Sequence, residues 1–171
     1  MLQNEINNIA YIIGKAYDIG MQTVFNPSPF TEELKNIDLS KISYLVLNEV
    51  EAKGFFKTDD INEIYTQIKT AYPELKVVLT LGSKGCTYAD KTEILSCPAF
   101  NVKAVDTTAA GDTFTGYFVT SVAKGAKYST ALKTASAASA LAVSKMGAAP
   151  SIPTVNEVEI ALETLEAQIN F

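Results

Sequence analysis

Histidine is absent from the 171-residue sequence, and only two cysteines are present. Without histidine, the common zinc sites and a catalytic triad built on histidine are excluded. The two cysteines, Cys86 and Cys97, fall in separate strand-like stretches without the spacing of metal ligands. The sequence alone therefore favours reading them as small apolar residues in a reducing compartment.

Basic charge and long apolar runs are also scarce. The chain carries 14 basic and 19 acidic residues, a net charge of −5 and a pI near 4.8, and no Lys-rich run that could attract nucleic acid. No apolar run approaches membrane-spanning length, and the first residues lack the pattern of a signal peptide. We therefore expect a cytoplasmic protein without a nucleic-acid or membrane partner.

The composition of the chain is typical of one globular domain. Hydrophobic residues make up 47% of the chain and charged residues 19%, which is ordinary for a chain with a proper core. Strand-like segments at 21–25, 42–47, 76–81, 86–89 and 93–97 alternate with helical patterns at about 4–17, from 58 or 59 to 72, 110–123, 129–145 and from 155. This order predicts an α/β fold with a partial, doubly wound, Rossmann-like sheet, and we expect residues 1–171 to form a single domain.

The most informative stretch is the small-residue turn at Ala109, Ala110 and Gly111, where the helix at 110–123 is expected to begin. Small side chains leave the first helical turn uncovered, and its unpaired N–H groups and the helix dipole suit an anion. Asp112, in that turn, has two interpretations. It is either an acid that stabilises the dipole, or a general base beside a cradle that holds a transferring phosphoryl group.

Two further groups of polar residues follow predicted strands. Asn48 and Glu51 come directly after the strand at 42–47, and a loop from Gly82 to Gly85 follows the strand at 76–81. Open α/β sheets bind ligands beyond the carboxyl ends of their strands. Asn48 and Glu51 are equally typical of a helix start, and the glycines equally fit a hairpin turn, so both interpretations stay open.

Residues 106–114, Asp-Thr-Thr-Ala-Ala-Gly-Asp-Thr-Phe, resemble the C-terminal signature of the ribokinase (PfkB-type) carbohydrate kinase family. The stretches 48–51, 80–85 and 147–151 resemble further motifs of that family in the same order. The resemblance runs from residue 2 to 151 but covers only about the C-terminal half of the family's fold. It implies a ribokinase-like fold in which the N-terminal strands and the β-lid over the sugar are missing.

The resemblance also implies an activity: ATP-dependent phosphoryl transfer to the hydroxymethyl group of a sugar, most simply ribose. Asp112 would be the catalytic base and a substrate contact, and Ala109, Ala110 and Gly111 would form the anion hole. Glu5, which by itself is only an acid in a first helical turn, would contact the sugar. The implied nucleotide contacts are Asn48, Thr80, Gly82, Ser83, Gly85, Gly111 and Ser136.

The resemblance also implies that two cations bind. Magnesium would be held indirectly through Glu51. A monovalent cation, expected to be potassium, would be enclosed mostly by backbone oxygens of two loops and a helix end. Its implied ligands are Asp106, Thr108, Ala142, Lys145, Gly147 and Ser151.

The sequence also departs from the family. Ser136 stands where the family often places a histidine against the adenine. Because the sugar-binding half is missing, we expect the 171 residues alone to be inactive, and the exposed sheet edge predicts a homodimer. The alternative is a non-catalytic fragment that binds nucleotide or mediates oligomerisation. The sequence does not choose among ribose, a deoxyribose, a fructose and a nucleoside.

Overall fold

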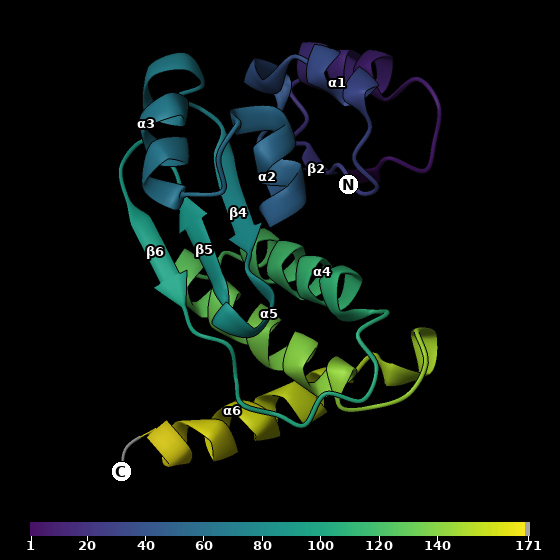
Figure 1. Ribbon diagram of the computed structural model, residues 1–171, viewed down its shortest axis with the longest axis vertical. Helices are drawn as coiled ribbons and strands as arrows, with labels where there is room; N and C mark the ends of the chain where they lie inside the picture. The colour runs from purple at the N-terminus through teal and green to yellow at the C-terminus, as the bar shows by residue number, and fades with distance from the viewer. Residues whose placement is uncertain (170–171) are drawn as a thin grey trace. The chain divides into compact units, whose positions relative to one another are not determined.

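The computed structural model describes residues 1–169, with side chains described up to residue 164. Its strands form one sheet in the order β1-β2-β3-β4-β5-β6, in which β1 to β4 run parallel. This confirms the predicted α/β class. The elements, shown in Figure 1, are β1 (Leu2–Gln3), α1 (Ile9–Asp18), β2 (Val24–Asn26), β3 (Tyr44–Asn48), α2 (Glu49–Phe56), α3 (Ile61–Ala71), β4 (Lys76–Thr80), β5 (Cys86–Ala89), β6 (Ile94–Cys97), α4 (Ala110–Ala123), α5 (Tyr128–Val143) and α6 (Val155–Ile169).

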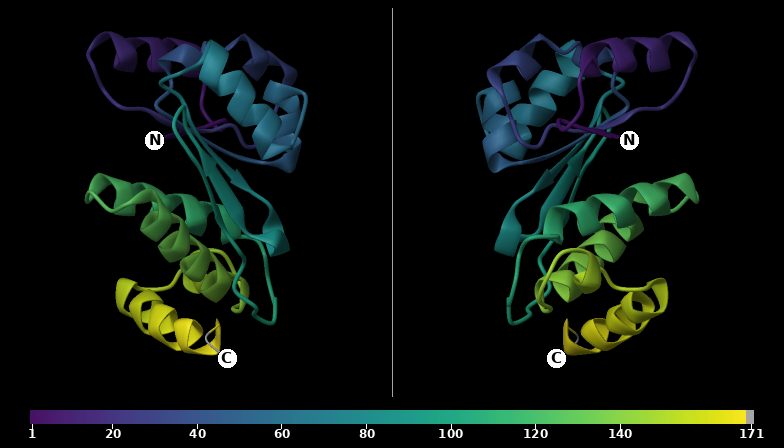
Figure 2. Two further views of the ribbon diagram at one scale, coloured as in Figure 1. Left: turned by 90° about the vertical axis from the view of Figure 1, so that its left-hand side faces the viewer. Right: turned by 90° about the vertical axis from the view of Figure 1, so that its right-hand side faces the viewer.

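The chain divides into two compact units. The first consists of Met1–Leu81 and Thr87–Leu95, and the second of Gly82–Cys86 and Ser96–Phe171. The first unit holds the parallel strands and α1 to α3, and the second holds α4 to α6 (Figures 1 and 2). The expectation of a single domain stays a prediction.

The core of the first unit lies between the parallel strands and α1, α2 and α3. Side chains alternate across a strand, so every second residue of β3 and β4 faces these helices. Those residues are fully buried in one apolar cluster with Ile13, Phe56, Ile64 and Ile68: Leu45, Leu47, Val77 and Leu79. Each such side chain contributes about 1.5–3 kcal/mol on burial. Val46 and Val78, on the opposite face, are buried as well, which is typical of a parallel sheet.

Two predicted boundaries in the first unit are wrong. Helix α1 begins at Ile9 rather than near residue 4, because Asn8 has a left-handed backbone with φ of 63° and the chain before it pairs as β1. The strand predicted from residue 21 begins at Val24, because the Met21 N–H still donates to the Ala16 carbonyl at the end of α1. In both places a local backbone bond decides the boundary.

The second unit is built on the helix pair α4 and α5. Helix α5 carries a fully buried stripe of small residues, which lets a neighbouring helix approach closely: Ala131, Ala135, Ala138 and Ala142. Helix α6 packs on α5 through Val158, which lies against Ala137 and Ala138. The predicted bounds of α4 are confirmed.

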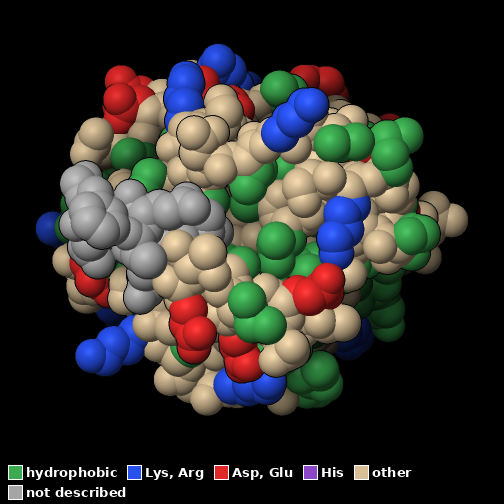
Figure 3. All heavy atoms as spheres, turned by 90° about the horizontal axis from the view of Figure 1, so that it is seen from below, with side chains coloured by type: hydrophobic (Ala, Val, Ile, Leu, Met, Phe, Trp, Pro, Cys, Tyr) green, Lys and Arg blue, Asp and Glu red, His purple; other side chains and the backbone are tan. Residues whose placement is uncertain are grey.

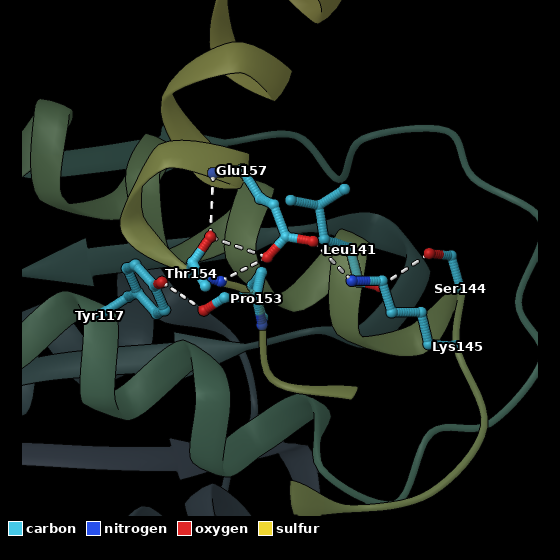
Figure 4. A network of polar contacts seen from close by, with 7 residues as sticks. All are labelled: Tyr117, Leu141, Ser144, Lys145, Pro153, Thr154 and Glu157. Carbon is cyan, nitrogen blue, oxygen red and sulfur yellow. Dashed lines mark hydrogen bonds and ion pairs between the residues drawn. The ribbon is translucent and has the colours of Figure 1, made fainter. Parts of the chain in front are cut away.

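The start of α6 is fixed by polar contacts (Figure 4). The Thr154 N–H donates to Glu157 Oε2 at 2.6 Å, the Glu157 N–H donates to Thr154 Oγ1, and Lys145 Nζ lies 2.9 Å from Glu157 Oε1. The Tyr117 hydroxyl donates to the Pro153 carbonyl at 2.7 Å. The Thr154 N–H, Lys145 and the Thr154 hydroxyl together lower the pKa of Glu157 to about 2. The turn before α6 is therefore attached to both α4 and the end of α5.

The surface shown in Figure 3 carries Lys side chains and acidic side chains scattered among hydrophobic ones. Among the described residues, no helix is long and apolar enough to cross a membrane.

Candidate functional site

The first turn of α4 is open. Its N-cap residue, Ala109, makes no side-chain hydrogen bond to the turn, and the helix begins with a bond from the Thr113 N–H to the Ala109 carbonyl. A Cβ atom placed on Gly111 would meet nothing within 4 Å, and Asp112 beside it is exposed. The first N–H groups of a helix have no acceptor within the helix, and the dipole makes this end positive. The turn therefore has the chemistry and the room for an anion.

Helix α5 holds this turn in place. The Ser139 hydroxyl donates to the Ala110 carbonyl at 3.1 Å. The N–H groups of Val105 and Asp106 both donate to the Val143 carbonyl, at 2.7 and 3.1 Å, at the end of the same helix. The segment from 105 to 110 is thus anchored at both ends, so the N–H groups of the open turn are preorganised.

Asp106 joins two loops that are 41 residues apart. Its Oδ1 accepts the Thr108 N–H at 3.0 Å and the Thr108 hydroxyl at 2.5 Å, and its Oδ2 accepts the Gly147 N–H at 2.9 Å. These bonds, the Thr108 hydroxyl first, lower the pKa of Asp106, which is therefore ionised at neutral pH. Gly147 has a φ of 89°, a conformation that favours glycine.

The structure thus brings together three of the six residues expected around a monovalent cation. The Ala142 carbonyl accepts the Lys145 N–H at 3.1 Å, and the buried Ser151 hydroxyl donates to the Ala148 carbonyl at 2.7 Å. Carboxylate, carbonyl and hydroxyl oxygens are the kinds of donor that fit a hard cation such as potassium, and a site shared by all six residues stays a prediction. The Lys145 side chain, paired with Glu157, is not part of that set, so only its backbone oxygen could serve.

The loop from Gly82 to Gly85 is a tight turn. The Gly85 N–H donates to the Gly82 carbonyl at 3.1 Å, and both glycines have positive φ, 55° and 100°. A Cβ atom on Gly85 would lie 2.1 Å from the Cys97 carbonyl oxygen. The hairpin interpretation is therefore confirmed, and Ser83 is left exposed at the tip. The predicted contacts with nucleotide stay predictions.

Ser136, expected near the adenine, lies on α5 and is 8% exposed. Its hydroxyl shares a hydrogen bond with the Cys86 thiol at 3.3 Å. It stands three residues before Ser139, so the two serines lie on the same face of α5. Ser136 contacts Cys86 at the start of β5, and Ser139 contacts the Ala110 carbonyl in the first turn of α4. The role of Ser139 was missed in the sequence, because its contact with the Ala110 carbonyl joins segments 29 residues apart and leaves no local pattern.

In the first unit, Asn48 and Thr80 pair at the carboxyl ends of β3 and β4. Asn48 Oδ1 accepts the N–H groups of Val50 and Glu51 at 2.9 and 3.0 Å, and Glu51 Oε2 accepts the Asn48 N–H at 2.9 Å. This is a complete capping box, so the helix-start interpretation is confirmed. Glu51 is 3% exposed, and burial raises its pKa. One of its oxygens is engaged in the cap, and an indirect contact with magnesium stays a prediction.

Glu5 lies in an exposed turn after β1, in the first unit, whereas Asp112 belongs to the second. The interpretation of Glu5 as an acid in the first turn of a helix is wrong, because α1 begins four residues later. A contact with sugar stays a prediction.

Comparison with known proteins shows which family the chain belongs to. The model of the family described as pfkB family carbohydrate kinase matches residues 4–155, which include the open turn, Asp112 and the loop at Gly147. The chain belongs to this family. The resemblance of its motifs to the PfkB-type kinases is therefore confirmed.

Individual relatives agree with the family. The chain is 40% identical over 154 residues to a ribokinase of Staphylococcus aureus, covering 87% of this chain and 50% of that protein. It is 32% identical over 173 residues to a ribokinase of Lactococcus lactis, covering 99% and 55%. The structure of Arabidopsis thaliana ribokinase complexed with ribose and ATP superposes with a TM-score of 0.80 at 28% identity, covering 95% and 55%.

These matches also confirm the ribokinase-like fold and its partial nature. The chain spans about half the length of the relatives it matches.

Proposed function

We propose that the chain is the phosphate- and nucleotide-binding part of a ribokinase-like kinase, which transfers the terminal phosphoryl group of ATP to the hydroxymethyl group of a sugar. The open first turn of α4, with Asp112 beside it, is the observation that carries this proposal. The kinship with sugar kinases supports it, as does the Arabidopsis relative complexed with ribose and ATP.

The reaction needs two protein groups on α4. The Gly111 N–H would stabilise the negative charge on the transferring phosphoryl group, joined by the Ala110 N–H once it leaves the Thr107 carbonyl, to which it donates at 3.2 Å. Asp112 would take the proton from the sugar hydroxyl as its oxygen attacks the terminal phosphorus and the bond to the bridging oxygen of ADP breaks. Ribose is the sugar that we propose, on the strength of the related ribokinases.

Further nucleotide contacts are proposed in each of the two units, beginning with the second. Gly82, Ser83 and Gly85 belong to one turn, in which Gly82 and Ser83 are exposed and Gly85 is buried, and the exposed part suits phosphate oxygens. Ser136 lies one turn of α5 before the serine that supports the cradle. In the first unit, Asn48 and Thr80 are proposed to contact nucleotide and Glu51 to hold magnesium through water. Magnesium would neutralise charge on the phosphates.

A monovalent cation is proposed to bind between the 106–108 turn and the 147–151 loop. The bond from Gly147 to Asp106 supports this, since it brings the two loops together. The ion would keep the turn before α4 in place and so aim the N–H groups of the cradle. In a complete kinase that carries these two loops, activity should then be higher in potassium than in sodium or an organic cation.

The test uses the 171-residue chain in two assays. Calorimetric titration with magnesium and ATP should show weak binding, and a coupled assay with ribose should show no rapid turnover, because the sugar-covering part of the family's fold is expected to be missing. Binding without turnover, followed by turnover in a complete relative that carries the same α4, supports the proposal. Failure to bind ATP would contradict it.

A further inference from the structure

The two cysteines stand opposite each other on neighbouring strands. The Asp90 N–H donates to the Glu93 carbonyl at 3.1 Å and closes the turn between β5 and β6. The two strands have four residues each, and counting outward from this bond places Cys86, the first residue of β5, opposite Cys97, the last residue of β6. The Cα atoms of opposed residues lie about 4.5–5.5 Å apart, within the range of about 4.4–6.8 Å that a disulfide spans.

The two thiols differ in access. Cys86 is 2% exposed and shares its hydrogen bond with Ser136, whereas Cys97 is partly exposed. The adjacent Cys86 thiol, with smaller effects from Ser136 and from the charge of Lys133, lowers the pKa of Cys97 to about 6. The pKa of Cys86 is raised by Cys97 and by burial. The accessible sulfur is therefore the one that ionises, and the buried sulfur keeps its proton.

We propose that Cys97 and Cys86 form a peroxide-responsive thiol pair, in which Cys97 is oxidised first and Cys86 resolves it to an intramolecular disulfide. This inference rests on the geometry of the hairpin and not on the proposed kinase function. The thiolate is the nucleophile in such chemistry, so the first step falls to the ionised and accessible sulfur.

The chemistry balances with hydrogen peroxide as the oxidant. The Cys97 thiolate attacks one peroxide oxygen, the O–O bond breaks, and a sulfenic acid and hydroxide form. The Cys86 sulfur then attacks the Cys97 sulfur, the S–O bond breaks, and the oxygen leaves as water together with the Cys86 proton. Two thiols lose two electrons in total, and the peroxide becomes water.

Closure of the disulfide removes the thiol hydrogen of Cys86, so that in its hydrogen bond with Ser136 only the serine hydroxyl can then donate. Ser136 lies on the same face of α5 as Ser139, whose hydroxyl supports the Ala110 carbonyl in the open turn of α4. Cys86 and the open turn of α4 therefore both contact α5, through serines three residues apart. Cys97 is also the residue whose carbonyl lies against Gly85, at the base of the exposed loop.

The test is oxidation of the native 171-residue chain by hydrogen peroxide, followed by thiol titration and intact mass. We expect both thiols to disappear together, with a loss of two hydrogen atoms that dithiothreitol reverses. The Cys86→Ser variant should instead stop at a sulfenic acid that dimedone traps. The Cys97→Ser variant should react at least about tenfold more slowly, because its remaining thiol is buried and protonated.

The Cys86→Ala variant, checked by circular dichroism, repeats the experiment in case serine disturbs the interior. A chain unfolded in urea is the control, in which the two single variants should react at similar rates. Equal rates in the native single variants would overturn the proposal. A disulfide formed between two chains would also overturn it. So would survival of both thiols in the wild type at a peroxide excess that oxidises the Cys86→Ser variant.

Discussion

In the first unit, α2 begins with its N–H groups capped by its own side chains, whereas α4 in the second unit begins with small residues and no side-chain cap. Both helices have an acid in the first turn. Glu51 is buried and bonded to the Asn48 N–H, and Asp112 is exposed beside Gly111. A capped helix start has used its hydrogen-bonding capacity internally and contributes to stability. An uncapped start keeps that capacity for a ligand.

A third helix start sharpens the comparison. Helix α6 is capped by Thr154 and Glu157 in the same reciprocal way as α2. Helices α2 and α6 are thus closed by side chains, whereas α4 begins without a side-chain cap, as α1 and α5 also do. What distinguishes the start of α4 is its small residues, with Asp112 beside them. Replacements at the capped starts should change stability, and replacements at the open start should change binding and turnover.

The largest effect is expected at Asp112. In a complete kinase that carries this α4, Asp112→Asn should lower kcat by about 10²–10⁴ while ATP affinity stays nearly unchanged, because the amide cannot accept the proton. Steady-state kinetics with ribose and a separate ATP titration measure the two quantities. A variant with normal kcat would show that Asp112 only stabilises the helix dipole.

A smaller effect is expected at the capped start of α2. Asn48→Ala should lower the free energy of unfolding by about 0.5–2 kcal/mol, because the N–H groups of Val50 and Glu51 lose their acceptor. Urea unfolding of the 171-residue chain measures this. The control is Asn7→Ala, which removes an exposed asparagine side chain from the same unit. Equal stability of the two variants would mean that the capping box contributes nothing.

The smallest effect is expected at α6 and depends on pH. The pKa of Glu157 is about 2 in the folded chain, below its ordinary value of 4.5, so the carboxylate stabilises the fold above pH 4.5 and this contribution is lost as the pH falls toward 2. The stability difference between the wild type and Glu157→Gln should therefore shrink between pH 5 and about 2. Thermal unfolding across this range measures it. A difference that stays constant with pH would exclude the ionised cap.

Local signals in the sequence predicted much of this arrangement. The small-residue turn placed the start of α4 at Ala110, and the spacing of Asn48 and Glu51 is that of a capping box. Two-residue β1 was missed because so short a strand carries no periodicity, and α1 was started too early because one left-handed residue, Asn8, leaves no apolar pattern.

Contacts between distant segments could not be predicted from the sequence. The bond from Gly147 to Asp106 spans 41 residues, and nothing in either loop alone indicates it. The cysteine pair is intermediate between the local features that the sequence predicted and the distant contacts that it did not. The strand-like segments at 86–89 and 93–97 were predicted, and counting along them from the short turn between them would have set Cys86 opposite Cys97.

The central claim, that the open turn of α4 binds phosphate, is tested most directly by two leucine variants of one helix. An added Cβ on Gly111 or Gly116 would meet no atom within 4 Å apart from the adjacent residues and backbone of its own helix, and neither glycine has a positive φ, so Gly111→Leu and Gly116→Leu should both fold. Only the first places a side chain over the turn. Calorimetric titration with magnesium and ATP should show binding by the wild type and Gly116→Leu, and a loss of about tenfold or more in Gly111→Leu, which corresponds to about 1.4 kcal/mol. Equal affinities in the two variants, or no binding by the wild type, would contradict the account.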